Sequence, residues 1–280
     1  MTDNDTNFLY LADMLPKKYL NFYTRFEKVL IDCNIPYNLL PNTKDVWAVD
    51  YMPIQIEANK FVQFIYNPDY LRTTKKWSNT ISDVDAICMA INIKPQKSPI
   101  LLDGGNLVRS NDKAIMCDKV FAENRGIKER DLIKEIKNLL QVDKLIFIPT
   151  HPHDFTGHAD GMVRFYEANT VLINDYSKED IHFQIRFRMA LHNAGLEYIE
   201  IPYNPYGNTK KDYANGEYIN FLQMAQVIII PTFGIKEDQI VINQFEQLFK
   251  GKTIATVDSN DIAYDSGILN CISWNLKAKE

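Results

Sequence analysis

The stretch from Phe155 to Phe165 reads FTGHADGMVRF, and both the fold and the chemistry can be worked out from it. Apolar and polar residues largely alternate along it, which favours an extended strand. Side chains two residues apart on a strand share a face, so His158 and Asp160 are predicted to project into one space. A proton-transfer group beside a fixed negative charge indicates chemistry on a cationic, nitrogen-rich substrate.

Polar residues recur in the same way along the rest of the chain, at the ends of apolar runs. Their separations are 53, 55, 62 and 51 residues, and the residues are Asp50, Asp103, His158, Asn220 and Cys271. Helix-like periodicity lies between some of them, at 129–140, 181–193 and 240–249. Five αβ units of similar length are typical of a repeat fold. A doubly wound sheet is the alternative, but no GxGxxG follows a strand.

The expected strands are short and apolar. They cover residues 8–11, 46–49, 61–64, 100–102, 145–149, 171–173, 198–202, 218–222, 227–231, 253–257 and 267–272. A helix to about Asn34 follows the first of them, with Pro16 suited to its first turn. No linker rich in Gly, Ser or Pro divides the chain, so one domain over residues 1–280 is predicted.

Composition limits the class of protein. The chain has 280 residues, 46% hydrophobic and 24% charged, as is ordinary for a soluble globular protein. A net charge of −5 argues against nucleic acid as a partner. The polar start from Met1 to Thr6 lacks secretory features, and the longest aliphatic run, Val227 to Ile230, cannot span a membrane. Four cysteines without a CxxC pair indicate reduced thiols, so a cytoplasmic protein is expected.

Cys271 is the candidate nucleophile, because it closes the fifth unit where other units carry Asp and His. For Cys33, Cys88 and Cys117 the preferred interpretation is a small buried hydrophobe. A thiol with a pKa of ~8.5 is only a few per cent thiolate at neutral pH. Cys271 would therefore need His158 or a bound cation nearby in order to react.

Asp50 and Asp103 each follow a short apolar run. Either residue alone is typical of a turn or a cap. Together with Asp160, and with His158 and Cys271 at comparable positions of other units, they fit a shared centre better. Carboxylates match the planar guanidinium group through bidentate hydrogen bonds. Buried carboxylates are costly unless paired, so such a site would await a cation.

A metal site is the alternative, formed by four residues within a stretch of ten: His151, His153, His158 and Asp160. The spacing fits neither HExxH nor HxHxDH, since Phe155 follows Asp154. Neighbouring prolines place His151 and His153 in a loop. A metal hydrolase is therefore the less favoured hypothesis.

Five short segments, in order, carry a resemblance to a known family: WAVDYMP at 47–53, DGGN at 103–106, TGHAD…RF at 156–165, YINF…P at 218–231 and GILNCI at 267–272. They are similar to the W-x-R-D-x-G-P, E-G-G, T-x-G-H-x-D…R-F, Y-x-N-F…P and G-G-x-H-C-I-T motifs of the agmatine deiminase and Porphyromonas-type peptidylarginine deiminase family. That family belongs to the guanidino-modifying pentein superfamily. The resemblance covers roughly residues 45–275.

The resemblance implies a five-bladed α/β propeller with pseudo-five-fold ββαβ repeats. It also implies that Cys271 attacks the guanidinium carbon, that His158 protonates the leaving nitrogen and then activates water, and that Asp103 orients His158. Ammonia and a ureido product would be released, with no metal or organic cofactor. The implied substrate-binding residues are Asp50, Asp160, Trp47, Arg164 and Asn220.

The chain departs from the family's motifs at Val49, Met52, Asp103 and Asn270, where the motifs have Arg, Gly, Glu and His. The expected partner is a small cationic guanidino substrate, which can be agmatine, arginine or a peptidyl arginine; a homodimer stays open. Two other hypotheses keep the same fold. One is an amidinotransferase, and the other is a guanidine-binding protein that has lost turnover.

Overall fold

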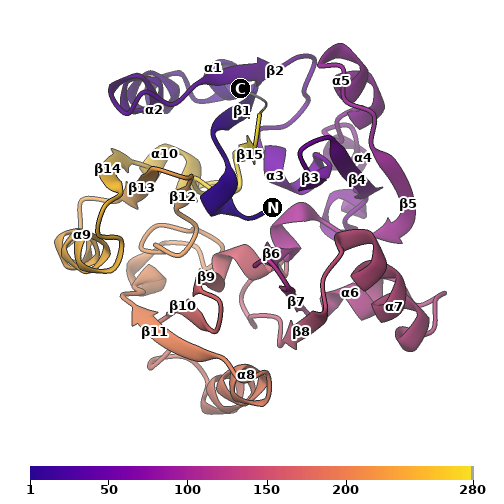
Figure 1. The fold of residues 1–280 in the computed structure, drawn as a ribbon. Helices are drawn as coiled ribbons and strands as arrows, with labels where there is room; N and C mark the ends of the chain where they lie inside the picture. Colours follow the sequence, from indigo (N-terminus) through magenta and orange to yellow (C-terminus); the bar gives the residue numbers. More distant parts are fainter. Residues whose placement is uncertain (279–280) are drawn as a thin grey trace.

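Five small sheets, each of three strands, form a ring in the computed structural model, which describes residues 1–278 and their side chains except at positions 76 and 77 (Figure 1). In every sheet the first strand runs antiparallel to the middle strand, and the third runs parallel to it. This is the predicted five-bladed α/β propeller of ββαβ repeats.

The blades are built from consecutive segments of the chain. In chain order their strands are β3 (Ile54–Glu57), β4 (Lys60–Ile65) and β5 (Gln96–Leu101); β6 (Val108–Arg109), β7 (Lys113–Cys117) and β8 (Lys144–Ile148); β9 (Val163–Glu167), β10 (Thr170–Asn174) and β11 (Glu197–Ile201); and β12 (Leu222–Gln223), β13 (Val227–Thr232) and β14 (Thr253–Asp258). The remaining blade combines β15 (Ser273–Leu276) with β1 (Phe8–Ala12) and β2 (Tyr37–Leu40).

That last blade closes the ring, because it joins the two ends of the chain. Strand β1 pairs antiparallel with β15, with Phe8 opposite Leu276 and Leu11 opposite Ser273. Figure 1 shows the N-terminal segment inside the ring. Neither the first nor the last strand is therefore left without a neighbour in its sheet.

A helix joins the two parallel strands of each blade, since a parallel pair needs a long crossover. These helices are α2 (Leu20–Asp32), α5 (Val84–Ala90), α7 (Glu129–Leu140), α8 (Ile181–Asn193) and α9 (Glu237–Leu248). Helix α7 shows why they form: Leu132, Ile136, Leu139 and Leu140 recur at helical spacing and are buried, while the exposed residues between them, Lys134, Glu135 and Asn138, are polar.

The shorter helices lie in the connections. They are α1 (Leu15–Lys18), α3 (Ala48–Tyr51), α4 (Lys75–Ser78), α6 (Lys119–Glu123) and α10 (Asn260–Ala263), with 3₁₀ turns η1 (Asp3–Asp5), η2 (Asp69–Thr73), η3 (Gly104–Asn106), η4 (Ala159–Gly161) and η5 (Pro205–Gly207). Within residues 1–278, no helix is long and apolar enough to cross a membrane.

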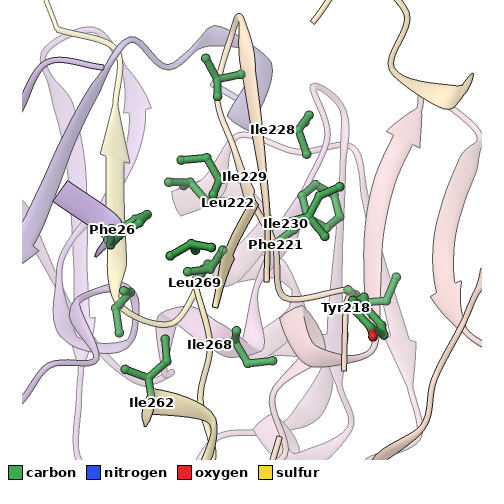
Figure 2. Packing of buried hydrophobic residues seen from close by; sticks show 14 of the residues in the cluster. Phe26, Tyr218, Phe221, Leu222, Ile228, Ile229, Ile230, Ile262, Ile268 and Leu269 are labelled. Carbon is green, nitrogen blue, oxygen red and sulfur yellow. The ribbon is translucent and has the colours of Figure 1, made fainter. Parts of the chain in front are cut away.

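The largest buried cluster surrounds β13, whose Ile228, Ile229 and Ile230 are fully buried. Figure 2 shows these isoleucines with Phe221 and Leu269, which come from the turns before β12 and β15. A strand buried on both faces reads as a continuous apolar run rather than an alternating one. Packing around β13 thus fixes the two turns that carry Asn220 and Cys271.

Four predicted strands are wrong, and they share one cause. Residues 46–49 lead into helix α3, His158 to Asp160 lie at the 3₁₀ turn η4, and the runs 218–222 and 267–272 are mostly turns that precede the short strands β12 and β15. These turns point apolar side chains into the core, so their composition resembles that of a strand. The helices predicted at 129–140 and 181–193 are confirmed, and the third begins at Glu237 rather than at 240.

Candidate active site

The five recurrent polar residues all occupy the turn that leads into the first strand of a blade. Asp50 lies in α3 before β3, Asp103 precedes η3 and β6, His158 precedes η4 and β9, and Asn220 and Cys271 directly precede β12 and β15. Because the blades repeat the same path, these turns meet at one end of the ring. Four of the five line a single cavity of about 420 Å³; Asp103 lies behind its wall.

His158 is clamped between two carboxylates. Its Nε2 lies 3.1 Å from Asp103 Oδ2, and its Nδ1 lies 3.5 Å from Asp50 Oδ1. The side chain of Asp103, although shorter than Glu, therefore reaches the imidazole. Burial alone would lower the pKa of His158, but Asp50 and the hydrogen bond with Asp103 raise it to about 10. The imidazole is thus protonated at neutral pH and can donate a proton.

Gly105 allows these groups to approach one another. Its N–H donates a hydrogen bond of 3.0 Å to Asp50 Oδ1. A Cβ atom at Gly105 would lie 2.5 Å from both Asp50 Oδ1 and His158 Nδ1, closer than atoms can pack. The glycine pair after Asp103 thus serves the close contact between the α3 and η3 turns, and it is not a phosphate loop.

Cys271 faces a second set of polar groups. Its Sγ lies 3.3 Å from Asn220 Oδ1 and 3.9 Å from Asp160 Oδ2. Asn220 Oδ1 also accepts from the N–H groups of Asn270 and Cys271, and Asn270 Nδ2 donates to Asp160 Oδ2 at 2.6 Å. The turn is therefore fixed by the hydrogen bonds that it donates to the side chains of Asn220 and Asp160. The other three cysteines do not line the cavity.

The carboxyl groups at the empty site outnumber its basic groups, since Asp50 and Asp160 face a single imidazole. Burial raises the pKa of Asp50 to about 7, and it also raises the pKa of Asp160. Burial, Asp160 and Asp50 together raise the pKa of the Cys271 thiol well above its usual range. Buried carboxylates with raised pKa values become favourable as anions when a cation enters. This arrangement can therefore bind a cation, present a thiol to it, and supply a proton from His158.

Two further residues predicted to bind the substrate, Trp47 and Arg164, differ in their position relative to the cavity. Trp47 lines the cavity, where its ring covers Gly267 so closely that a Cβ there would lie 2.3 Å away. Arg164 does not line this cavity. Its guanidinium pairs with Asp3 and lies over the ring of Phe221, 5.0 Å from the centroid. Its placement argues against the predicted contact between Arg164 and the substrate.

The four residues of the metal hypothesis all line this cavity, but they contact two different sets of partners. His158 and Asp160 lie at the site above, whereas His151 stacks on Tyr176 with its Nε2 3.7 Å from Glu179. His153 lies beside His151, with ring centroids 5.9 Å apart. In the described part of the chain, no three His, Cys, Asp or Glu side chains are arranged to hold a metal ion.

Lys119 is a site residue that the sequence did not reveal. Its side chain is 11% exposed, and its Nζ lies 3.6 Å from Asp103 Oδ2 and 3.1 Å from Glu123 Oε1. It also donates to the Thr156 carbonyl at 2.6 Å, which ties the His158 turn to helix α6. Only the Lys119–Glu123 spacing of four residues was visible in the sequence, and such pairs are usually surface features.

Glu217 is the second residue that sequence reasoning missed. It lines the cavity, and burial together with Asp154 and Asp160 raises its pKa to about 8. Glu179 and Asp154 line the same wall. A carboxyl in a turn gives no sequence signal of this kind, since its pKa depends on neighbours that are distant in sequence.

Known proteins provide the remaining evidence. The family model of Porphyromonas-type peptidyl-arginine deiminases matches residues 27–276. A Streptomyces coelicolor relative assigned to the agmatine deiminases is 21% identical over 253 residues, covering 82% of this chain and 75% of the relative.

Solved structures agree on the fold. A Campylobacter jejuni agmatine deiminase superimposes with a TM-score of 0.80 at 18% identity, covering 98% of this chain and 94% of the other. A Pseudomonas aeruginosa DDAH, solved in complex with citrulline, has a TM-score of 0.59 at 12% identity, with 97% and 99% covered. The match over residues 27–276 decides the relationship: the chain belongs to the Porphyromonas-type peptidyl-arginine deiminase family.

Proposed function

We propose that this protein is a hydrolase of guanidino compounds, a deiminase that acts through Cys271 and needs no cofactor. The supporting observation is the convergence of Cys271, His158, Asp50 and Asp160, from three distant segments, on one cavity with excess negative charge. Guanidinium is a planar cation that two carboxylates can hold in place.

In the first step the substrate's guanidinium binds between Asp50 and Asp160. Its positive charge opposes the carboxylates that keep the Cys271 thiol protonated, so the thiol loses its proton to solvent. The thiolate sulfur then forms a bond to the guanidinium carbon. Asn220, 3.3 Å from Sγ, keeps the sulfur oriented.

In the second step His158 donates its proton to one nitrogen of the tetrahedral adduct, and that nitrogen leaves as ammonia. An amidino-thioether on Cys271 remains. The neutral imidazole then takes a proton from water, and the water oxygen attacks the same carbon. When the carbon–sulfur bond breaks, the hydroxyl proton passes to the departing sulfur, so the ureido product is released, the Cys271 thiol is restored and His158 is again protonated. Asp103, 3.1 Å from Nε2, holds the imidazole through both transfers.

The wall beyond the reacting groups favours a substrate with a second cationic group. Glu217, Glu179 and Asp154 line it, and the carboxyl of Glu217 is buried with a raised pKa. A terminal amine beside these three acids would be stabilised, whereas an α-carboxylate would be repelled by them. Lys178 and Lys211 also line the cavity, but acids outnumber them there. Among the three candidates, agmatine therefore fits better than arginine or a peptidyl arginine.

A substrate panel tests this function. Agmatine, arginine and an N-acylated arginine amide are each incubated with the protein, and ammonia and ureido product are measured together. We expect both products in equal amounts, with agmatine fastest, and none from the C271S variant. Ureido formation from none of these guanidines by folded protein would contradict hydrolysis. Amidino transfer to an added amine would favour an amidinotransferase instead.

We also propose that residues 1–280 form one domain and that the protein is cytoplasmic. The pairing of β1 with β15 makes the two ends of the chain parts of one blade, which supports the first proposal. All four cysteines are free thiols, which supports the second. Limited proteolysis checks the first, since a single domain should resist cleavage between blades until it unfolds.

A further inference from the structure

A second, smaller cavity lies behind the acids of the proposed active site. It measures about 110 Å³, and its lining includes Asp160, Asn270 and Arg164. Asp160 lines both cavities, so its carboxylate stands at the wall between them. Anything that binds Asp160 from the second cavity would compete with a cation that binds it from the first.

Arg164 is the group placed to do so. It lies on β9, four residues after Asp160, and its side chain is only 4% exposed. Its positive charge already acts on Asp160, where it offsets part of the rise in pKa that burial causes. Since the side chain of Arg164 ends in a guanidinium, it carries the same chemical group that the proposed substrate presents to Asp160.

Asp3 holds Arg164 in another position. Asp3 Oδ2 pairs with Arg164 Nη2, while Asp3 Oδ1 accepts from Asn275 Nδ2 at 3.4 Å. The segment around Asp3 is itself fixed: Asn4 Oδ1 accepts from Gln223 Nε2 at 2.8 Å, and the Thr6 carbonyl accepts from the Ala225 N–H at 3.0 Å. The N-terminal segment is thus docked on strands of two other blades.

We propose that Asp3 is a positioning residue that keeps the guanidinium of Arg164 away from Asp160, so that Asp160 stays available for the substrate's guanidinium. Without Asp3, the guanidinium of Arg164 has the second cavity to move through and a buried carboxylate to pair with. The guanidinium of Arg164 would then occupy Asp160, one of the two carboxylates proposed to bind the substrate's guanidinium. Arg164, in turn, acts on the reaction only through Asp160.

The inference rests on the proposed function in one respect, namely that Asp160 binds the substrate's cationic group. A labelling assay tests it without turnover. Chloroacetamidine is a cation that alkylates a thiol: the sulfur displaces chloride from the methylene carbon. Iodoacetamide alkylates the same thiol but is neutral. The ratio of the two labelling rates at Cys271, followed by mass spectrometry, reports cation binding beside Cys271.

Four variants define the experiment: D3N, D5N, R164M and D3N/R164M. D5N is the matched control, because Asp5 bonds to Thr2 and acts on Arg109 as Asp3 does, but makes no pair with Arg164. If Arg164 occupies Asp160 nine-tenths of the time in D3N, the labelling ratio falls roughly tenfold. We expect D5N to match the wild type, and D3N/R164M to match R164M.

The outcomes are decisive in both directions. A D3N ratio equal to that of the wild type overturns the proposal, as does a D3N effect that persists when Arg164 is Met. A parallel fall of both labelling rates would show general disruption of the site and would also overturn it. If none of the tested guanidines is hydrolysed but the expected ratios appear, the hydrolase proposal fails and this one stands. In an active enzyme, D3N should raise KM and leave kcat nearly unchanged.

Discussion

Two charged networks support the proposed site from opposite sides, and they are built alike but placed differently. In the first network His158 contacts Asp103, and Asp103 contacts Lys119. In the second, Cys271 contacts Asp160, which lies within the field of Arg164, and Arg164 is paired with Asp3. In both cases an acid faces the reactive group, and a buried cation stands behind the acid.

The difference lies in what each acid can still bind. Asp103 is outside the cavity and already engaged by His158 and Lys119, so it can only orient and charge the imidazole. Asp160 lines the cavity, and its pKa is raised by burial, so it is ready for a cation. Asp103, which is already paired with His158 and Lys119, therefore acts in the chemical step. Asp160 still has the capacity to pair with a cation, so it acts in substrate binding.

The largest predicted effects separate these two acids. D103N should lower kcat by roughly 10² to 10⁴ with little change in KM, because the imidazole loses the hydrogen bond that orients it and one of the carboxylates that raise its pKa. D160N should mainly weaken binding, because one partner of the substrate's guanidinium is lost. Steady-state kinetics give the first comparison, and calorimetry with agmatine in a C271S background gives the second.

These two variants also test the contrast itself. Equal losses in kcat for both, with binding intact in both, would mean that Asp160 is part of the chemical step. Thermal unfolding of each variant checks that the fold is retained, since both residues are buried.

The dependence of binding on pH follows from Asp50. In the empty site its pKa is about 7, and a bound guanidinium favours the anion, so its pKa must be lower in the complex. Affinity should therefore be highest above pH 7 and fall by up to about tenfold per pH unit below it. Calorimetry of C271S with agmatine, in buffers of different ionisation enthalpy, should detect proton release near pH 6.5. An affinity that is flat from pH 5.5 to 7.5 would contradict this.

Much of the outer part of the ring could be predicted from the sequence, and much of the inner part could not. Helices α7 and α8 were located by their periodicity, because each buries apolar residues at helical spacing, although α8 also exposes Ile185 and Met189. The turns at Asp50 and His158 were mistaken for strands, because their apolar residues are buried by blades that the local sequence does not contain.

The residues proposed to react could be selected from the sequence, but the residues that support them could not. The resemblance led to Cys271 and His158, and the spacing of the repeats suggested that they meet. It also placed Arg164 at the substrate, whereas β9 begins at Val163 and directs Arg164 toward Asp3. Glu217 had no signal, because the acids that raise its pKa come from a neighbouring blade. Lys119 had only its spacing to Glu123, because its contact with Asp103 forms when the turn before β6 folds against α6.

The smallest predicted effect concerns Lys119, and it asks whether the cation behind Asp103 matters as the one behind Asp160 does. K119M removes a charge 3.6 Å from Asp103 Oδ2. The negative charge of Asp103 would then act on His158 unopposed, so the pKa of His158 should rise further above about 10. A more basic imidazole gives up its proton to the leaving nitrogen less readily, and kcat should fall roughly three- to tenfold with KM unchanged.

K113M is the matched control, because the side chain of Lys113 is similarly buried, at 14% exposed, and pairs with Asp112 away from the cavity. If K119M lowers the melting temperature as K113M does but leaves kcat intact, then Lys119 only ties the Thr156 turn to α6. The two networks would then have a similar arrangement of charges, but only the cation behind Asp160 would affect the reaction.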